Sequence, residues 1–264
     1  PSGSAGHGFV EAAGGKGLNQ AVAAARAGAH VSFVGAVGND DAGRSLRQVA
    51  VDDGINTAGL VTVAGRPTGR AVIGVGDDGS NLIIVVPGAN ASVDAAVVAA
   101  AERTISGARV VLAQHEVPDA AVEAAFRLAR TAGAVTILNP APAHPIDPAI
   151  LALVDILVPN EHEYPLLGDV SAVPCLVITE GERGCRVIRG AETSRVPAFA
   201  VDAVDTVAAG DAFCGALAAS LAAGLDLEQA LVRASAAGAL ATLAHGAVPS
   251  LPTSDAIDWL IARG

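Results

Sequence analysis

The sequence predicts an α/β protein with a doubly wound, mostly parallel sheet and helices on both faces. Two observations carry this prediction. From residue 94 onward, short β-branched runs alternate with Ala-rich segments of helical length, as in βαβ units. The chain is also 52% hydrophobic but only 3% aromatic. Its core must therefore be built from Ala, Val, Leu and Ile, which suits Ala-rich helices packed on Val/Ile strands.

The first third of the chain predicts a different pattern. The elements expected there are a short strand at 9–11, a helix at 17–28, a strand at 31–37 and a helix at 40–53. Three β runs follow at 60–63, 70–75 and 82–86, separated by Gly, Asp and Pro turns. We interpret these three runs as a meander that forms a small β appendage.

The remainder predicts the alternating sheet. Strands are expected at 109–113, 135–138, 156–158 and 175–179, with helices at 94–105, 119–132 and roughly 161–167. A β-rich stretch over 187–201 precedes two or three Ala-rich helices near 210–223, 227–243 and 254–263. No internal repeat or low-complexity linker divides the sequence, so we expect a single domain over residues 1–264.

Charge and cysteine content narrow the class of protein. The net charge is −11 and no Lys/Arg run exists, which disfavours nucleic-acid binding. The apolar stretches are too short to span a bilayer, and no signal segment opens the chain. Cys175, Cys185 and Cys214 lack CxxC spacing, which favours buried free thiols in a reducing compartment. We therefore expect a cytoplasmic protein that binds neither nucleic acid nor membrane.

Two glycine-rich segments invite a nucleotide-binding interpretation. Residues 74–79 fit GxGxxG, but a β run follows them instead of the helix that a dinucleotide fingerprint requires. A hairpin turn is the better interpretation. Gly14-Gly15-Lys16-Gly17 fails as a Walker A motif but puts Lys16 at a helix start, with Asn19 one turn along. These groups could bind hydroxyls or an anion, or simply form a helix entry.

The most informative segment runs from Asp205 to Phe213. Small residues at 208–210 let successive N–H groups face one point and form an anion nest at a helix start. Asp211 would lie beside the bound anion in the first helical turn. An Asp there can be only a cap, but capping does not require three small residues before it and Asp205 upstream. Phosphoryl transfer requires this pairing of N–H donors with a carboxylate that accepts the hydroxyl proton.

Two further segments follow predicted strands. Asn160-Glu161-His162-Glu163 comes at a strand end, where α/β sheets present ligand groups. Its carboxylates could hold Mg²⁺ through water, or could only begin a capped helix. Residues 179–184 form a Gly turn that is either a hairpin or a nucleotide loop.

Together these motifs resemble the ribokinase-like (PfkB-type) carbohydrate kinases. The matching segments, from about residue 8 to the C-terminus, are 14–25, Pro87-Gly88-Ala89-Asn90, Asn139-Pro140-Ala141-Pro142-Ala143, Pro159-Asn160-Glu161-His162-Glu163, 205–217 and Gly246-Ala247-Val248-Pro249-Ser250. The resemblance implies a doubly wound domain with a β-sheet lid, contributed here by about 8–13 and 60–90. Such a lid often pairs two subunits, so a homodimer is expected.

The resemblance also implies a role for individual residues. The sugar would be bound by Gly15, Lys16, Asn19, Glu116 and Asp211. Asp211 would act as the base, with Ala208, Ala209 and Gly210 holding the γ-phosphoryl charge. ATP would be contacted by Asn160, Thr179, Glu180, Gly181, Glu182, Arg183, Gly184, Gly210 and Ser235. Glu163 would place Mg²⁺ through water. An activating K⁺ would be bound by Asp205, Val207, Ala241, Ala244, Gly246 and Ser250.

The implied reaction is transfer of the γ-phosphoryl group of ATP to the primary hydroxyl of a pentose, D-ribose giving ribose 5-phosphate. Alternatives are a kinase of another sugar or a nucleoside, and a non-catalytic binding relative. The family's first strand, with its Asn-x-Asp, is expected upstream of Pro1. Cys214 stands where the family commonly has Asn, and Ser235 where an adenine-stacking His can occur.

Overall fold

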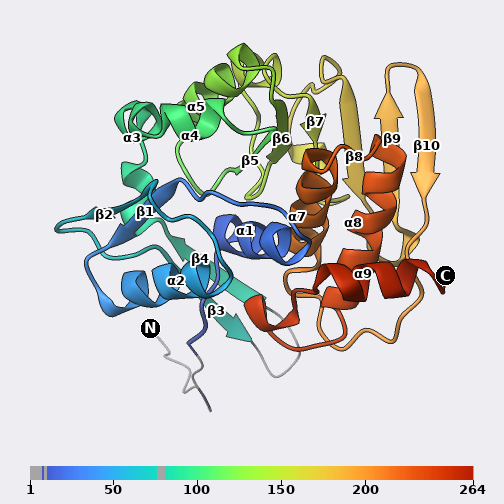
Figure 1. Ribbon diagram of the computed structural model, residues 1–264, viewed down its shortest axis with the longest axis horizontal. Helices are drawn as coiled ribbons and strands as arrows, with labels where there is room; N and C mark the ends of the chain where they lie inside the picture. Colours follow the sequence, from blue (N-terminus) through green and yellow to red (C-terminus); the bar gives the residue numbers. More distant parts are fainter. Residues whose placement is uncertain (1–7, 9–10, 76–80, 264) are drawn as a thin grey trace.

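The fold is organised around a six-stranded sheet, seen in the computed structural model of Figure 1, which describes Gly8 and residues 11–75 and 81–263. The strands are β5 (Val110–Gln114), β6 (Val135–Asn139), β7 (Ile156–Leu157), β8 (Cys175–Thr179), β9 (Cys185–Arg189) and β10 (Glu192–Val196). They lie in the order β10-β9-β8-β7-β6-β5. Strands β5 to β8 are parallel, and β9 and β10 continue the sheet in antiparallel pairing.

Helices cover both faces of this sheet. One face packs against α5 (Asp119–Thr131) and α6 (Pro148–Leu151), and the other against α7 (Ala209–Ala222) and α8 (Leu227–Ala241). Neighbouring strand residues point to opposite faces: Ile137 packs with α7 and α8, whereas Leu138 packs with α5. The prediction of a mostly parallel sheet with helices on both faces is confirmed. Among the helices of the described residues, none has the length and apolar character needed to cross a bilayer.

Two predicted helices differ in the structure. The helix expected over 94–105 is divided into α3 (Ala95–Ala100) and α4 (Glu102–Ser106), because Ala101 leaves the helical conformation, with ψ at 8°. The helix expected over 161–167 is wrong: a turn leads into a short 3₁₀ segment, Tyr164–Leu166. The Asn160 side chain caps this turn, and Pro165 has no N–H with which to continue a helix.

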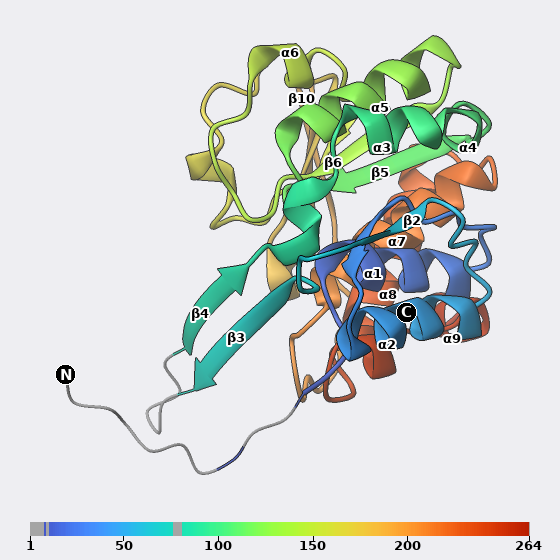
Figure 2. The same cartoon turned by 90° about the vertical axis from the view of Figure 1, so that its left-hand side faces the viewer.

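The prediction of a three-stranded meander is also wrong. β1 (Gly35–Gly38) and β2 (Leu60–Val63) are parallel neighbours, joined by the crossover helix α2 (Asp41–Asp52). Of the three runs, only β3 (Arg70–Val75) and β4 (Asn81–Val86) pair with each other, as an antiparallel hairpin that extends away from the body of the molecule in Figure 2. This pairing confirms that no helix follows the Gly74 segment, although residues 76–80 lie outside the described chain.

The β3–β4 hairpin falls within the range 60–90 that is expected to contribute to a lid. Phe9 and Val10, part of the predicted first strand, lie outside the described residues, and Glu11 belongs to no strand. The single-domain organisation over 1–264 and the lid boundaries stay predictions. The remaining helices are α1 (Lys16–Arg26) and α9 (Ser254–Ile261).

Helix α1 packs unusually close to α7, and Gly215 makes this possible. A Cβ at position 215 would lie 2.5 Å from the Ala23 Cβ and 2.6 Å from the Gln20 carbonyl oxygen. No side chain larger than hydrogen fits without moving one helix. The contact brings the first turn of α1 alongside the first turn of α7.

We predict that Gly215→Ala destabilises the protein by roughly 1–3 kcal/mol, because the methyl group forces α1 and α7 apart. The free energy of unfolding in urea measures this cost. Gly238→Ala in α8 is the matched control, since its nearest atom, the Ala209 oxygen, would lie 3.3 Å from the new Cβ. Equal losses in the two variants would show that the α1–α7 approach is not constrained at this position.

Candidate active site

A cavity of about 210 Å³ opens where the carboxyl ends of the parallel strands meet the N-terminus of α7. It is lined by Lys16, Asn139, Val158, Asn160, Glu163, Thr179, Thr206, Ala208, Gly210, Asp211 and Cys214. This is the edge at which parallel sheets bind ligands. Residues from both the predicted sugar-binding set and the predicted ATP-binding set thus share one cavity.

The carboxylate of Asp211 is held by two side-chain amides. Asn19 donates from Nδ2 to Asp211 Oδ2 at 2.8 Å, and Gln20 donates from Nε2 to Asp211 Oδ1 at 2.9 Å. Asp211 is only 8% exposed, yet it borders the cavity. Each carboxylate oxygen has one amide donor and keeps a lone pair for a further partner. The orientation of Asp211 is therefore fixed before any ligand arrives.

Gln20 anchors a network of buried amides that the sequence analysis missed. Besides Asp211, it donates to Asn139 Oδ1 at 2.9 Å and accepts from Gln114 Nε2 at 2.5 Å. Asn139 in turn donates to the Val158 carbonyl oxygen at 2.8 Å. Gln20 is 1% exposed and all three of its polar contacts are made within the protein. The network joins α1 to the ends of β5 and β6. Its sequence signal was the polar residue that ends each of these strands.

The segment before α7 forms the predicted turn. Ala208 has φ 62°, and no other non-glycine residue in the described chain has a positive φ. This conformation costs roughly 1–2 kcal/mol for a residue with a Cβ. The N–H groups of Gly210 and Asp211 face no acceptor within the described residues, as expected of a first helical turn. Together with the helix dipole they create a positive potential at the cavity.

The Asp205 side chain links the turn before α7 to the loop after α8. Its Oδ2 accepts from the Gly246 N–H and its Oδ1 from the Val207 N–H, both at 3.0 Å. These two hydrogen bonds hold the pKa of Asp205 below its usual range, and the bond from Gly246 has the larger effect. The Ser250 hydroxyl donates to the Ala247 carbonyl oxygen at 2.8 Å. The predicted cation-binding segments around 205–207 and 246–250 are thus neighbours. Ala241 ends α8, and Ala244 follows it in the loop to this region.

The predicted sugar-binding residues converge on the start of α1. Gly15 precedes the helix with φ 104°, a conformation that favours glycine. The Lys16 N–H donates to Glu116 Oε2 at 2.9 Å. Burial raises the pKa of Glu116. The Oδ1 atom of Asn19 is buried and has no hydrogen-bond partner among the described residues, so it can accept a hydrogen bond from a ligand hydroxyl.

Of the predicted nucleotide-binding residues, Asn160, Thr179 and Gly210 line the cavity, together with Glu163. Asn160 and Glu163 cap each other: the Asn160 N–H donates to Glu163 Oε2 at 2.9 Å, and the Glu163 N–H donates to Asn160 Oδ1 at 2.8 Å. Thr179 pairs with Asn160 in an isolated bridge. The second Glu163 oxygen remains available to a water or a metal ion.

The loop after Thr179 has a structural component. The Glu180 N–H donates to the Gly184 oxygen at 2.7 Å and closes the loop around Gly181–Arg183. The Glu180 carboxylate is buried between Arg195 at 2.6 Å and Arg186 at 3.1 Å. These partners lower the pKa of Glu180, and the hydrogen bond from Arg195 has the largest effect. Glu180 therefore holds the loop with its side chain and can offer a ligand only its backbone. Glu182 is exposed, and Ser235 donates to the Pro197 oxygen at 2.9 Å outside the cavity lining.

The sequence also matches the model of a known protein family. The family model described as pfkB family carbohydrate kinase matches residues 1–254. The chain belongs to the PfkB family of carbohydrate kinases. The expectation of an ATP-dependent carbohydrate kinase is thereby confirmed.

Several proteins that this chain resembles are ribokinases. The Haemophilus influenzae ribokinase is 35% identical over 94% of this chain and 87% of its own length. The Bacillus subtilis ribokinase is 37% identical over 96% and 89%. Among solved structures, the Thermotoga maritima ribokinase has a TM-score of 0.84 at 33% identity, covering 95% of this chain and 88% of its own. A structure of Arabidopsis thaliana ribokinase complexed with ribose and ATP has a TM-score of 0.86 at 29% identity, with the same coverage.

The raised pKa of Glu116 predicts how stability depends on pH. Folding favours the protonated form, so the contribution of Glu116 to the free energy of unfolding falls as pH rises from its ordinary value of 4.5 through the raised value. Glu116→Gln keeps an acceptor for the Lys16 N–H without the charge. We expect the stability of Glu116→Gln to rise relative to wild type between pH 4.5 and pH 8, measured by urea unfolding. A difference that does not change with pH would contradict this account.

Proposed function

We propose that this kinase transfers the γ-phosphoryl group of ATP to the primary hydroxyl of D-ribose, giving ribose 5-phosphate and ADP. One observation carries the proposal: a buried carboxylate, Asp211, is clamped by two amides beside free N–H groups at a helix N-terminus. The ribokinase relatives support ribose as the acceptor. The Arabidopsis ribokinase complexed with ribose and ATP supports both ligands.

Asp211 acts as the general base in this proposal. The ribose primary hydroxyl lies against the lone pair that each Asp211 oxygen keeps and gives its proton to the carboxylate. A bond forms between the hydroxyl oxygen and Pγ while the bond from Pγ to the β-phosphate oxygen breaks, and ADP leaves. Because Asn19 and Gln20 prevent rotation of the carboxylate, no ordering cost remains for the reactive step.

The sugar is bound by the groups at the start of α1. Asn19 Oδ1, for which the described part of the chain supplies no partner, accepts a hydrogen bond from a ribose hydroxyl. Glu116 uses Oε2 for the Lys16 N–H and offers Oε1 to a second hydroxyl. Gly15 lets the backbone approach the ring, because its φ of 104° would be strained for any residue that carries a Cβ.

The transferred phosphoryl group is stabilised by the turn before α7. The N–H groups of Gly210 and Asp211 have no acceptor among the described residues, and both residues line the cavity at the helix N-terminus, where the helix dipole adds positive potential. These donors are in place before the reaction, so they favour the charge that develops on the γ-phosphoryl oxygens.

ATP and its metal ion are assigned to the opposite side of the cavity. Asn160 and the loop of residues 179–184 contact the nucleotide, with Ser235 near the base. Glu163 keeps one oxygen for a water of Mg²⁺, which prefers oxygen ligands and retains several waters. When bound, Mg²⁺ neutralises charge on the phosphates.

A monovalent cation is assigned to the segments tied together by Asp205. The available donors are all oxygens: the Asp205 carboxylate, the Ser250 hydroxyl and the carbonyls of Val207, Ala241, Ala244 and Gly246. Oxygen ligands suit a hard cation such as K⁺, and each Asp205 oxygen keeps a lone pair.

Turnover should rise when K⁺ replaces tetramethylammonium. Equal rates in the two salts would remove K⁺ from the proposal.

Two expectations concern the setting of the enzyme. We assign it to the cytoplasm, because its three cysteines are free and buried, as a reducing compartment allows.

We also expect a homodimer through the β3–β4 hairpin, since the side chains of Val72, Ile84 and Val85 on this hairpin are more than half exposed. Sedimentation of Val72→Lys should then give monomers. Unchanged dimers, or monomers already in the wild type, would contradict the hairpin contact.

The central prediction is that Asp211→Asn lowers kcat by roughly 10²–10⁴, the scale of a lost general base, with little change in the KM for ribose. ADP release measured with ribose as acceptor provides the test, and Asp41→Asn on the exposed start of α2 is the control. Wild-type kcat in Asp211→Asn would remove this residue from the chemistry.

The choice of sugar is tested separately. The kcat/KM of the wild type should be higher for D-ribose than for deoxyribose, a hexose or a nucleoside. A better rate with one of these would keep the kinase and reassign its substrate.

Gly210→Ala tests the anion nest without disturbing the fold. A Cβ at Gly210 meets no atom within 4 Å, and the residue has no positive φ, so stability should be unchanged or slightly higher. The methyl group would project into the cavity beside the phosphoryl position. We expect kcat to fall by up to roughly 10²–10³, the loss caused by removing one oxyanion donor. Full activity in Gly210→Ala would place the phosphoryl group elsewhere.

A further inference from the structure

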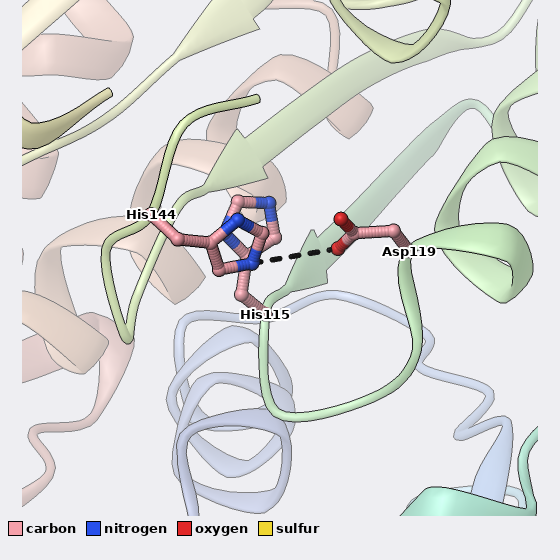
Figure 3. A group of neighbouring side chains, drawn as sticks. All are labelled: His115, Asp119 and His144. Carbon is pink, nitrogen blue, oxygen red and sulfur yellow. Dashed lines mark ion pairs between the residues drawn. The ribbon is translucent and has the colours of Figure 1, made fainter. Parts of the chain in front are cut away.

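Two histidines and an aspartate form a second cluster outside the cavity lining. His115 directly follows β5, Asp119 begins α5, and His144 lies in the loop after β6. One potential ligand atom from each lies within 4.8 Å of the others. Figure 3 shows the two imidazole rings stacked, with the Asp119 carboxylate directed towards them. The ring centroids are 4.2 Å apart with an interplanar angle of 19°.

His115 is the residue that points to a missing ligand. It is 7% exposed, and neither Nδ1 nor Nε2 has a hydrogen-bond partner within the described chain. The Pro142 backbone approaches the ring without completing a hydrogen bond of normal geometry. Leaving a polar group buried and unpaired costs roughly 1–3 kcal/mol. Burial lowers the pKa of His115, which favours the neutral imidazole that metals bind.

The contacts of His144 point the same way. Its Nδ1 lies 3.0 Å from the Pro145 carbonyl oxygen, which can only accept, so Nδ1 carries the proton. The neutral ring therefore has its lone pair on Nε2, which faces Asp119 Oδ1 at 3.6 Å. Two lone pairs facing each other repel unless a cation or a proton lies between them. A carbonyl on the outer nitrogen is also the usual support of a metal-binding histidine.

We propose that His115, His144 and Asp119 bind a divalent transition-metal ion of the zinc class. Two imidazoles and one carboxylate are a ligand set that Zn²⁺ uses, with a water in the remaining position. Zinc–ligand distances of about 2.0–2.1 Å separate tetrahedral ligands by roughly 3.3 Å. The distance of 3.6 Å between His144 Nε2 and Asp119 Oδ1 is already close to this value. The side chains of His144 and Asp119 are each 41% exposed, so they can rotate to close the wider gaps and admit the ion.

The position of the cluster gives the metal a structural consequence. The backbone N–H of His115 donates to the Ala141 carbonyl oxygen at 3.1 Å, so the turn after β5 already contacts the loop after β6. A metal bound by His115 and His144 would add a second link between these segments. Glu116, whose carboxylate accepts the Lys16 N–H, is the next residue along the chain. The ion would therefore hold the turn that carries Glu116.

The test is direct metal binding by the full chain after treatment with a chelator. Zn²⁺ is titrated calorimetrically, and Co²⁺ is titrated for the visible absorption of a tetrahedral site. His115→Leu and His144→Gln are the variants. His30→Gln, at an exposed histidine before β1, is the matched control.

We expect one Zn²⁺ per chain in wild type and His30→Gln, a rise in Tm on binding, and a Kd at least 10-fold weaker in both cluster variants. If His115→Leu does not fold, the half-exposed His144→Gln decides alone. The proposal is overturned if wild type binds no Zn²⁺ at 100-fold excess. In that case a proton shared by His144 and Asp119 accounts for the cluster. Equal zinc binding by wild type and His144→Gln would overturn it as well.

Discussion

The close approach of α1 to α7 is the constraint on which the active site depends. At Gly215 the two backbones come so near that no Cβ fits between them. This contact lets Asn19 and Gln20, on the first turn of one helix, reach the carboxylate of Asp211 on the first turn of the other. The geometry of the candidate site is therefore a product of helix packing, and the side chains only complete it.

The buried amides around Asp211 are stabilised by hydrogen bonds to one another. Gln20 bonds Gln114, Asn139 and Asp211 together, and Asn139 passes the link to Val158. The site also carries local costs, namely the left-handed Ala208, the desolvated Glu116 and the unpaired Asn19 oxygen. Each cost lies where a ligand would offset it, which is the expected signature of a binding site.

Much of this was predictable from sequence, because local signals were sufficient. The strand–helix alternation predicted the sheet, and the small residues before Asp211 predicted the turn at a helix start. Failures arose where distant residues decide. The pairing of Leu60–Val63 with β1 depends on a crossover, and the role of Gln20 depends on three partners brought together by folding. The segment after Asn160 had helical composition, but a side-chain cap and Pro165 produced a turn.

In the proposed mechanism, Gln20 contributes only by orienting the Asp211 carboxylate. A double-mutant cycle in single-turnover phosphoryl transfer to ribose tests this claim most directly, with Gln20→Met, Asp211→Asn and the double variant. Gln20→Met alone should slow transfer, and it should add almost nothing once Asp211 has been changed. If the two losses multiply instead, Gln20 and Asp211 act independently, and the amide clamp is not what positions the base.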